Sequence, residues 1–505
     1  MDGSEKQNQR AKIIQAQIRQ GAASVEDKPF AVQVFPRQEA PALAAADSGT
    51  VTGGVNASAT DPDHSFTNET DDFLTSLYLD TVFPCLFPCY HPATLEGGRS
   101  WLLTILKTNH AVFHAAISLS AYYFTLLLAR DATHTLRTPC EQHVWDTFNS
   151  HMDLSMRLIR QNLSDINAGG RQKRDIFHGT PILDGITHLL IFEAFMTNSE
   201  DWNLHLTAAL SHLDDIFRLC GLKDGKYHLH SVLLSMQQPS SIFQGTHLGF
   251  HVWSADQTSF LFSTAVLLYA DIVSSVCLRR VPKLQHCHDA LIAASSEPAT
   301  QTNYLLQMEN YFGCYGWALS LIDEIATLNT FEVARIPDNG GVLDEFVVQG
   351  KRVEAEFYHG LESLQSVPAS PGKADESAKN VQIAKLWLLA GLIYLSTFIY
   401  RGHIIDSSVR AHIYTALNLI KTFRSEYDIR PPMWPLCVIG CMVEDNQKPE
   451  VRHILSGLPP LQSFGMNKKV ANIIETAWEA RGSIRESSWS LVDHFESHMS
   501  DVLLI

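Results

Sequence analysis

Several features that mark enzymes and DNA-binding proteins are missing from this sequence. No cysteine stands before Cys85, whereas a DNA-binding zinc cluster needs several thiolates within a few tens of residues. Neither a Gly-x-Gly-x-x-Gly fingerprint nor a P-loop occurs, and there is no Gly-x-Ser-x-Gly nucleophile elbow. These absences exclude a zinc cluster in residues 1–84 and give no support to nucleotide binding or serine-hydrolase chemistry.

Positive charge is also scarce. Lys and Arg number 38 against 54 Asp and Glu, which gives a formal net charge of −16 at pH 7. A chain this acidic repels phosphate backbones and lacks the cationic surplus that supplies non-specific affinity for DNA. We therefore predict that this chain alone binds duplex DNA weakly or not at all, and that any action on DNA passes through a small local patch or a partner.

Hydrophobic runs of membrane-spanning length are not expected either. The two most apolar runs, residues 112–129 and 386–400, fall short of the ~20 residues that a spanning helix needs. The N-terminus is polar and has no apolar stretch of signal-peptide length. The nine cysteines are widely spaced and odd in number, which argues against a disulfide framework. We expect both runs to be buried helices and predict no association with a membrane.

What the sequence does contain is typical of a large helical protein. Hydrophobic residues make up 45% of the 505 residues and charged residues 18%, so most of the chain can bury enough apolar surface to fold. Residues 1–70 are instead rich in small and polar residues, and we predict a disordered N-terminal tail there. From Asp71 onward, apolar residues recur at helical spacing. The predicted fold class is all-α, with one large multi-helix domain over residues 71–505 and no sheet of three or more strands.

One helical stripe illustrates this spacing. Its apolar side chains share a face and are followed by Gly221 as a predicted C-cap; they are Leu206, Leu210, Leu213 and Phe217. Polar stretches rich in helix breakers interrupt the helical pattern. We interpret them as surface loops, at residues 167–181, 222–250 and 366–380.

Two cysteine pairs have a spacing that metal sites can use. Cys85 and Cys89 are four residues apart, as are Cys437 and Cys441, but no second pair follows either one closely. A structural zinc site needs four ligands, and a buried cysteine commonly behaves as a small hydrophobic residue. We predict core packing for both pairs and no bound metal.

Two histidine clusters lead to the same conclusion. His110 and His114 are spaced to share one helix face, but Ala111 stands where the zincin motif has glutamate. Residues 286–289 read His-Cys-His-Asp, and adjacent ligands in so short a run rarely surround a metal by themselves. We interpret this tetrad as a solvated loop and predict neither a metal site nor a cofactor.

An acidic pair supports the sharpest enzyme hypothesis. Terpene cyclases hold magnesium and a diphosphate with an Asp-rich helix motif, and Asp214 and Asp215 resemble part of it, although position 218 is Arg. Since Leu213 and Phe217 face inward, we predict that both aspartates point outward and that Asp214 and Arg218 form a surface pair. An all-α magnesium-dependent enzyme acting on an isoprenoid diphosphate remains the alternative function, with no catalytic residue assigned.

Five separated segments, in order along the chain, resemble one known family. Trp202, His205, Leu206 and Ala209 in the second segment match its pattern of Trp, then His-Leu, then a small residue. The segments are residues 71–88, residues 200–221, the stretch with Gly313 and Cys314, the stretch with Trp434-Pro435 and Gly440-Cys441, and the stretch with Trp478 and Trp489. Together they resemble the fungal-specific transcription factor domain, the helical regulatory domain usually found downstream of a six-cysteine zinc cluster.

The resemblance implies a fungal transcriptional regulator that acts in the nucleus on metabolic genes, secondary-metabolite genes among them. Its helical domain would bind the transcription machinery, a DNA-binding subunit or a small-molecule effector, and a homodimer is left open. The family's zinc cluster is not found in this sequence. Either an exon was lost, or the protein regulates without touching DNA itself. A helical scaffold protein without an effector is a third hypothesis, beside the regulator and the enzyme.

The matching residues also have architectural explanations. Trp202 and His205 precede an apolar stripe, and we predict that both are largely buried and anchor the helix that follows. Ser199 is the predicted N-cap of that helix. Pro435 suits the first turn of a helix, where its missing N–H costs nothing. Gly440 allows two helices to approach closely.

Overall fold

The computed structural model describes most of the chain from Glu69 onward. The predicted tail lies outside the described residues apart from Glu69 and Thr70, and so does the predicted N-cap Ser199. The described residues are 69–92, 98–129, 138–168, 176–196, 202–223, 225–236, 253–292, 306–333, 340–366, 374–400, 407–426, 430–458, 465–483, 489–500 and 502–504.

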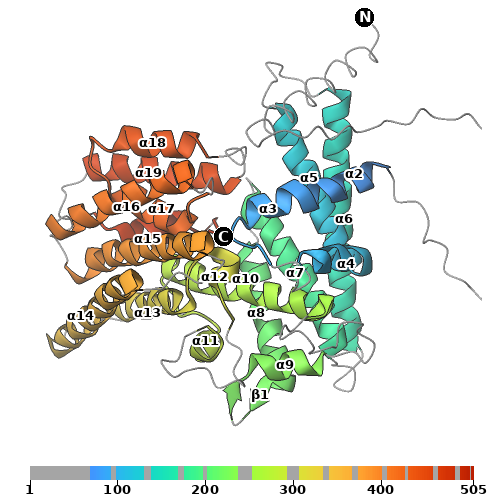
Figure 1. Cartoon of the computed structure of the whole chain (residues 1–505), viewed down its shortest axis with the longest axis horizontal. Helices are drawn as coiled ribbons and strands as arrows, with labels where there is room; N and C mark the ends of the chain where they lie inside the picture. The colour runs from blue at the N-terminus through green and yellow to red at the C-terminus, as the bar shows by residue number, and fades with distance from the viewer. Residues whose placement is uncertain are drawn as a thin grey trace, which may run out of the picture. The chain divides into compact units, whose positions relative to one another are not determined.

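A first group of helices runs from α2 to α9 and is drawn from blue to green in Figure 1. Two π-helical segments, η1 and η4, continue α2 and α8. The elements are α2 (Glu69–Leu77), η1 (Tyr78–Val82), α3 (Phe83–Leu86), α4 (Ser100–Thr108), α5 (His110–Ala129), α6 (Pro139–Ala168), α7 (Ile176–Phe195), α8 (Trp202–Ile216), η4 (Phe217–Gly221) and α9 (Leu229–Ser235).

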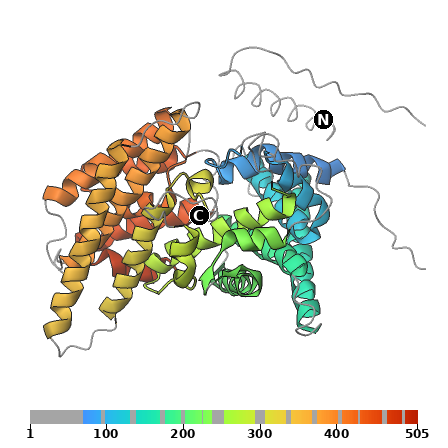
Figure 2. The ribbon, with the colours of Figure 1, turned by 60° about the horizontal axis from the view of Figure 1, so that its bottom comes forward.

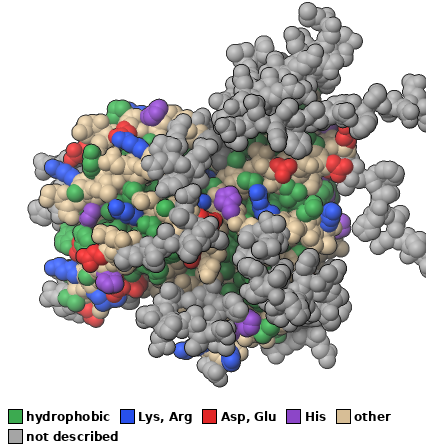
Figure 3. Space-filling view, in the orientation of Figure 1, with side chains coloured by type: hydrophobic (Ala, Val, Ile, Leu, Met, Phe, Trp, Pro, Cys, Tyr) green, Lys and Arg blue, Asp and Glu red, His purple; other side chains and the backbone are tan. Residues whose placement is uncertain are grey.

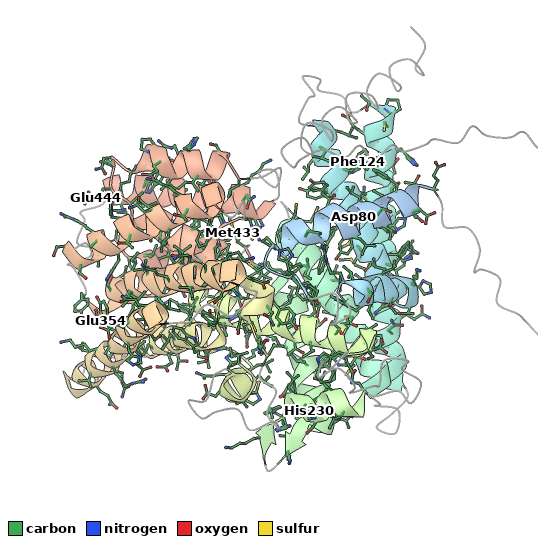
Figure 4. The ribbon with its side chains drawn as sticks, viewed as in Figure 1. Asp80, Phe124, His230, Glu354, Met433 and Glu444 are labelled. Atoms are coloured by element: carbon green, nitrogen blue, oxygen red, sulfur yellow. The ribbon has the colours of Figure 1, made fainter. Side chains whose placement is uncertain are left out.

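A second group runs from α10 to α20, and Figure 2 shows both groups from another side. Met433 lies among the helices of this group, whereas Glu354 and Glu444 lie at its periphery (Figure 4). The elements are α10 (Ala255–Cys277), α11 (Gln285–Leu291), α12 (Glu309–Phe312), α13 (Gly316–Val333), α14 (Gly340–Ser363), the 3-10 turn η6 (Leu364–Ser366), α15 (Ala374–Ile399), α16 (Ser407–Glu426), α17 (Met433–Met442), α18 (Lys448–Ser456), α19 (Gly465–Ser483) and α20 (Leu491–His498).

Strands are few among the described residues. Strands β1 (Leu222–Lys223) and β2 (Lys226–Tyr227) pair antiparallel, with Leu222 opposite Tyr227 and Lys223 opposite Lys226. Both residues of β1 are exposed, so this hairpin contributes little to the core. The all-α fold class is confirmed, and no sheet of three or more strands occurs in the part of the chain that the structure describes.

Helix α10 joins the two groups. A capping box fixes its start: Ser254 Oγ accepts from the Gln257 backbone N–H, and the Gln257 side chain accepts from the Ser254 N–H. The helix contacts α4, α7 and α8 of the first group and α13 and α20 of the second. Burial along most of its length makes α10 the centre of the core.

The expectation about hydrophobic length was wrong, because α5 and α10 are both long and apolar enough to cross a membrane by composition alone. The apolar run of α10 is not evident in the sequence because small polar residues such as Ser263, Thr264 and Ser274 interrupt it. All three of these side chains are buried. A helix buried on every side is apolar all round whether its surroundings are protein or lipid. The predicted apolar runs do form helices, within α5 and α15.

The predicted role of Gly221 was also wrong. This residue ends the π-helix η4, and it is not among the glycines with positive φ. An added Cβ would lie 2.7 Å from both Phe217 Cδ1 and Val232 Cγ2. Glycine is therefore required here by the close approach of two apolar side chains and not by a left-handed C-cap.

The predicted loops are shorter than the polar stretches that suggested them. Helix α7 begins at Ile176 and runs through Pro181, because the apolar residues that follow, Ile182 and Leu183, are buried in the core. Helix α15 begins at Ala374, and α9 lies inside the predicted gap at residues 222–250. Burial of a few apolar residues thus extends helices into segments that are polar on average.

The C-terminal motif predicted from sequence folds as expected. Pro435 lies in the first turn of α17. Gly440 faces α19 so closely that an added Cβ would lie 2.6 Å from Ile474 Cδ1. Trp478 of α19 donates a hydrogen bond from Nε1 to the Gly440 carbonyl at 2.8 Å. The glycine and the tryptophan therefore fix one helix pair together.

Candidate functional site

Two motifs that are 72 residues apart in sequence meet on the outer side of α8. Asp214 accepts hydrogen bonds at 2.7 Å from Arg218 Nε and from the Tyr227 hydroxyl. His286 Nε2 lies 3.3 Å from Asp214 Oδ1 and 3.1 Å from the Tyr227 oxygen. The predicted pair of Asp214 and Arg218 is confirmed. Asp214 does not simply point to solvent, however, because Tyr227 and His286 partly cover it.

The environment of Asp214 favours its ionised form. Partial burial raises the pKa of this carboxyl, but hydrogen bonds from Tyr227, Arg218 and His286 outweigh burial and leave the pKa below its ordinary value. Asp215 is exposed and takes no part in this cluster. Among the described residues no group of three or more His, Cys, Asp or Glu side chains is arranged to hold a metal ion. With three donors on Asp214, the pair does not present two free carboxylates to magnesium.

The tetrad at residues 286–289 is not a solvated loop, and that interpretation was wrong. It lies in helix α11, where His286 and Asp289 are exposed while Cys287 and His288 are buried. In a helix, two successive residues can face the core while their neighbours on either side face solvent. The tetrad is therefore divided between two environments and cannot act as one ligand set.

Two carboxylates lie beside the buried half of α11. His288 Nδ1 lies 3.2 Å from Asp323 Oδ2 of α13, and His288 Nε2 lies 3.8 Å from Asp271 Oδ2 of α10. Asp271 also accepts backbone N–H groups from Lys283 and Leu284, at 3.1 and 2.8 Å. Burial raises the pKa of Asp271, and these N–H groups oppose the rise. Asp271 of α10 thus fixes the segment between α10 and α11 from its buried side.

The same segment contacts α8 on its outer side. Arg280 Nη1 donates to Asn203 Oδ1 at 2.6 Å, and Lys283 Nζ donates to Thr207 Oγ1 at 2.6 Å. With the contact between His286 and Asp214, these form an ordered series in which positions 280, 283 and 286 meet positions 203, 207 and 214 of α8. We call these three contacts the α8 seam.

The C-terminal helix reaches the same region. Arg279 donates from Nη1 to Asp493 Oδ1 at 2.7 Å and to Glu496 Oε2 at 3.1 Å, both on α20. Arg279 has a φ of +49° and is the one non-glycine residue with positive φ in the described ranges. Trp202 Nε1, at the start of α8, donates to the Ser500 carbonyl at 3.0 Å. Helix α8, the segment after α10 and the C-terminal segment therefore converge.

The prediction for the start of α8 is confirmed for Trp202 and only partly correct for His205. Trp202 is buried and is the first residue of the helix. The His205 side chain remains 21% exposed, and its Nδ1 lies 2.6 Å from Glu193 Oε2 of α7. Trp202 anchors α8 to the core, whereas His205 joins α8 to α7 at the edge of the core.

The remaining predicted clusters lie apart from this region. Cys89, Cys437 and Cys441 are buried, and burial raises the pKa of Cys89 to about 11. Cys85 is half-buried. These positions agree with core packing, because a buried protonated thiol behaves as a small apolar group.

His114 pairs with a histidine of another helix rather than with His110. Its Nδ1 lies 3.0 Å from His151 Nδ1, and His151 Nε2 lies 3.6 Å from Asp71 Oδ1. Burial, and next the neighbouring His151, lower the pKa of His114 to about 4. His110 is exposed. His110 and His114 therefore do not form a shared site, although they are four residues apart in sequence.

Most of the α8 seam is not evident from the amino-acid sequence. Asn203, Thr207 and Asp214 share one face of a helix, which spacing alone could have shown. Their partners lie more than seventy residues away in an unremarkable basic segment, and no local pattern indicates that pairing. Tyr227 is 13 residues from Asp214, but no pattern in the sequence indicates that their side chains meet.

Comparison with known proteins identifies the family. The model of the fungal specific transcription factor domain matches residues 73–505, which is nearly all of the described chain. The chain belongs to this family. It is a transcriptional regulator and not an enzyme, and the family gives no support to the alternative of an isoprenoid-diphosphate enzyme.

Curated relatives include several fungal regulators. Transcription factor dibT of Pestalotiopsis microspora is 32% identical over 477 residues, which cover 90% of this chain and 74% of the relative. Pestheic acid cluster transcriptional regulator 3 of Pestalotiopsis fici is 24% identical, covering 85% of this chain and 74% of the relative. Trichothecene biosynthesis transcription regulator TRI10 of Fusarium sporotrichioides is 24% identical, covering 85% and 97%. No solved structure matches this chain.

Proposed function

We propose that this regulator controls the genes of one biosynthetic pathway in a fungal nucleus, and that residues 71–505 are its regulatory domain. The observation that carries the proposal is the family match along residues 73–505. Two relatives named for the pestheic acid cluster and for trichothecene biosynthesis support a role in secondary metabolism. The predicted tail of residues 1–70 would be a separate segment outside the regulatory domain.

Protein partners would connect this domain to DNA. The net charge of −16 supports weak direct binding. On the face shown in Figure 3, the described Lys and Arg side chains are interspersed with Asp and Glu rather than gathered in one basic patch. A DNA-binding subunit or a component of the transcription machinery would supply the DNA contact, and a small-molecule effector would adjust activity. Association of two copies of this chain into a homodimer is compatible with this arrangement.

Gene deletion tests the proposed pathway role. Deleting the gene in its fungal host should lower transcripts of one contiguous biosynthetic gene cluster, and the wild-type gene should restore them. Transcript sequencing of the deletion strain, the complemented strain and the parent measures this. A deletion that leaves every cluster unchanged would contradict pathway-specific control.

Gel-shift titration tests the expectation about DNA. The purified chain should not shift promoter fragments from that cluster at physiological salt, because it lacks the cationic surplus that phosphate contacts require. Addition of nuclear extract should supply the missing subunit and produce a shift that depends on this chain. Sequence-specific binding by the chain alone at nanomolar concentration would overturn the expectation.

A further inference from the structure

The last turns of α5 form an apolar surface that the core does not cover. Helices α5 and α10 are both long and strongly apolar, but 61% of the most apolar stretch of α5 is buried, against 100% for α10. Most of this difference lies at residues 124–128, which are all half-buried or exposed. Leu127 is 36% exposed and lies one helical turn after Phe124. Apolar side chains at this end of α5 are therefore accessible from outside the domain.

Helix α2 extends this apolar surface. Phe73 of α2 is 50% exposed, and its ring packs edge-on against that of Phe124, with ring centroids 5.5 Å apart. Phe124 is labelled on α5 in Figure 4. We call Phe73, Phe124, Leu127 and Leu128 the α2–α5 face. Exposed apolar side chains that adjoin one another in this way are typical of interaction sites.

The helices around this face carry negative charge and no Lys or Arg. Residues 69–82 and 110–129 make up α2, η1 and α5, and residues 138–156 include the first half of α6, which packs on α5. These three ranges contain seven acidic residues and neither Lys nor Arg. The acidic residues are Glu69, Asp71, Asp72, Asp80, Glu141, Asp146 and Asp153.

Two histidines in the same helices do not offset this charge. Burial lowers the pKa of His114 to about 4 and lowers the pKa of His151 as well, so both are largely uncharged at neutral pH. Arg99 donates to the Leu79 carbonyl at 3.3 Å, in η1 and beyond the end of α2. The surroundings of Phe73 are therefore acidic as well as apolar.

The charge of this face restricts its partner. DNA and anionic lipid are repelled by it, and so is a second copy of a chain whose net charge is −16. The backbone groups of α2 and α5 bond within their helices, so neither helix offers a strand edge, and recognition falls to side chains. A helix with apolar residues on one side and Lys or Arg beside them complements such a face.

We propose that the α2–α5 face is the docking site for a positively charged amphipathic helix of a protein partner. Apolar side chains of that helix cover Phe73 and Leu127, and its Lys or Arg side chains face Glu69 and Asp72. This site rests on the proposed function, in which a protein partner connects the domain to DNA, and it specifies the chemistry of that partner. Docking is measured on the purified chain without transcripts, so its failure is distinguishable from failure of pathway control.

Peptide binding to the full chain is the direct test. The probe is a fluorescein-labelled synthetic peptide of about five helical turns, with Leu at helical spacing and Lys elsewhere, and fluorescence anisotropy measures its affinity at physiological salt. Phe73→Ser/Leu127→Ser should weaken binding about 10-fold or more, because burial of one large apolar side chain is worth about that factor. Unchanged affinity would overturn the proposal.

Two exposed apolar residues elsewhere provide a matched control. Val348 of α14 and Tyr414 of α16 are 63% and 64% exposed, and their helices contain Lys and Arg as well as acidic residues. Val348→Ser/Tyr414→Ser should therefore leave the affinity for the peptide unchanged. An equal loss of affinity would show that the peptide adheres to any exposed apolar side chain, and the docking site would be wrong.

A charge reversal tests the acidic part of the face and leaves its apolar side chains in place if Phe73→Ser/Leu127→Ser fails to fold. Glu69→Lys/Asp72→Lys changes two exposed residues of α2. It should weaken binding of the Lys peptide about 5-fold or more. It should also permit binding of a matched peptide with Glu in place of Lys, which the wild type should not bind. An unchanged preference for the Lys peptide would contradict the proposal.

Sedimentation of the full chain distinguishes a partner from a second copy. Phe73→Ser/Leu127→Ser should leave the oligomeric state of the chain unchanged. Conversion of a dimer into a monomer by this variant would assign the α2–α5 face to an interface between copies and overturn the proposal.

Discussion

The helix pair formed by α17 and α19 and the α8 seam are held together in opposite ways. In the pair, Gly440 admits Ile474 at close range and Trp478 donates to the Gly440 carbonyl, so shape and one buried hydrogen bond act together. In the seam, Arg280 and Lys283 each make one polar contact at the surface. Tight apolar packing resists change at every atom, whereas single surface contacts exchange with water at little cost. The pair of α17 and α19 is therefore a rigid framework, whereas the α8 seam is a part of the molecule that can move.

The strongest test of the framework is Trp434→Ala. Trp434 of α17 is buried and stacks on Trp387 of α15, with ring centroids 5.3 Å apart. We expect a loss of about 3–5 kcal/mol, because truncating a buried tryptophan removes contacts and leaves a cavity. Urea unfolding measures the loss. Tyr414→Ala, at a largely exposed aromatic residue, is the control and should change stability by less than about 1 kcal/mol. Equal losses of stability in the two variants would contradict the distinction between the packed framework and the exposed surface.

A buried histidine of the first group gives a pH-dependent test. Burial lowers the pKa of His188 to about 4, whereas the unfolded chain binds the proton near pH 6.5. Stability is therefore fully present above pH 6.5 and is lost as the pH falls toward 4. At pH 5 this loss amounts to about 2 kcal/mol. His188→Gln should remove this loss of stability. The urea midpoints of variant and wild type at pH 7.5 and pH 5 give the comparison.

The control for this prediction is His110→Gln, since His110 is exposed at the start of α5. That variant should follow the pH dependence of the wild type. If His188→Gln shows the same pH dependence of stability as the wild type, the loss of stability in acid arises from other residues and not from protonation of His188.

The smallest effect is expected at the seam. Asp214→Asn should lower stability by about 1 kcal/mol or less, because it weakens surface contacts with Arg218, Tyr227 and His286. Asp215→Asn, at the exposed neighbour, should stay within about 0.5 kcal/mol of the wild type. Thermal unfolding of both variants gives the comparison. Magnesium-dependent turnover of a prenyl diphosphate that disappears in the double variant would instead revive the enzyme hypothesis.

The sequence was sufficient where a residue's role depends on near neighbours. Helical spacing predicted the all-α fold, and the types of Pro435 and Gly440 predicted their places in α17. The burial of Trp202 followed from its place before an apolar stripe. Each of these predictions needed only the period of a helix and the size of one side chain.

The sequence was not sufficient where a role depends on distant partners. The side chain of Arg279 finds its two carboxylate partners more than two hundred residues away on α20. The tetrad at residues 286–289 looked solvated because its composition is polar. Asp271 and Asp323 make burial of its His288 tolerable, and neither is a sequence neighbour. Partners that are distant in sequence decided both cases.

The central position of α10 has a consequence during synthesis of the protein. The ribosome releases α10 after the helices of the first group but before α13 and α20, which cover its other side. At about 5–20 residues per second, the chain beyond Cys277 takes on the order of 10–50 seconds to complete. Cover on that side of the apolar helix stays incomplete until α20 has emerged. The nascent chain is therefore expected to be a chaperone client, and aggregation during translation should depend on how quickly the chain beyond Cys277 emerges.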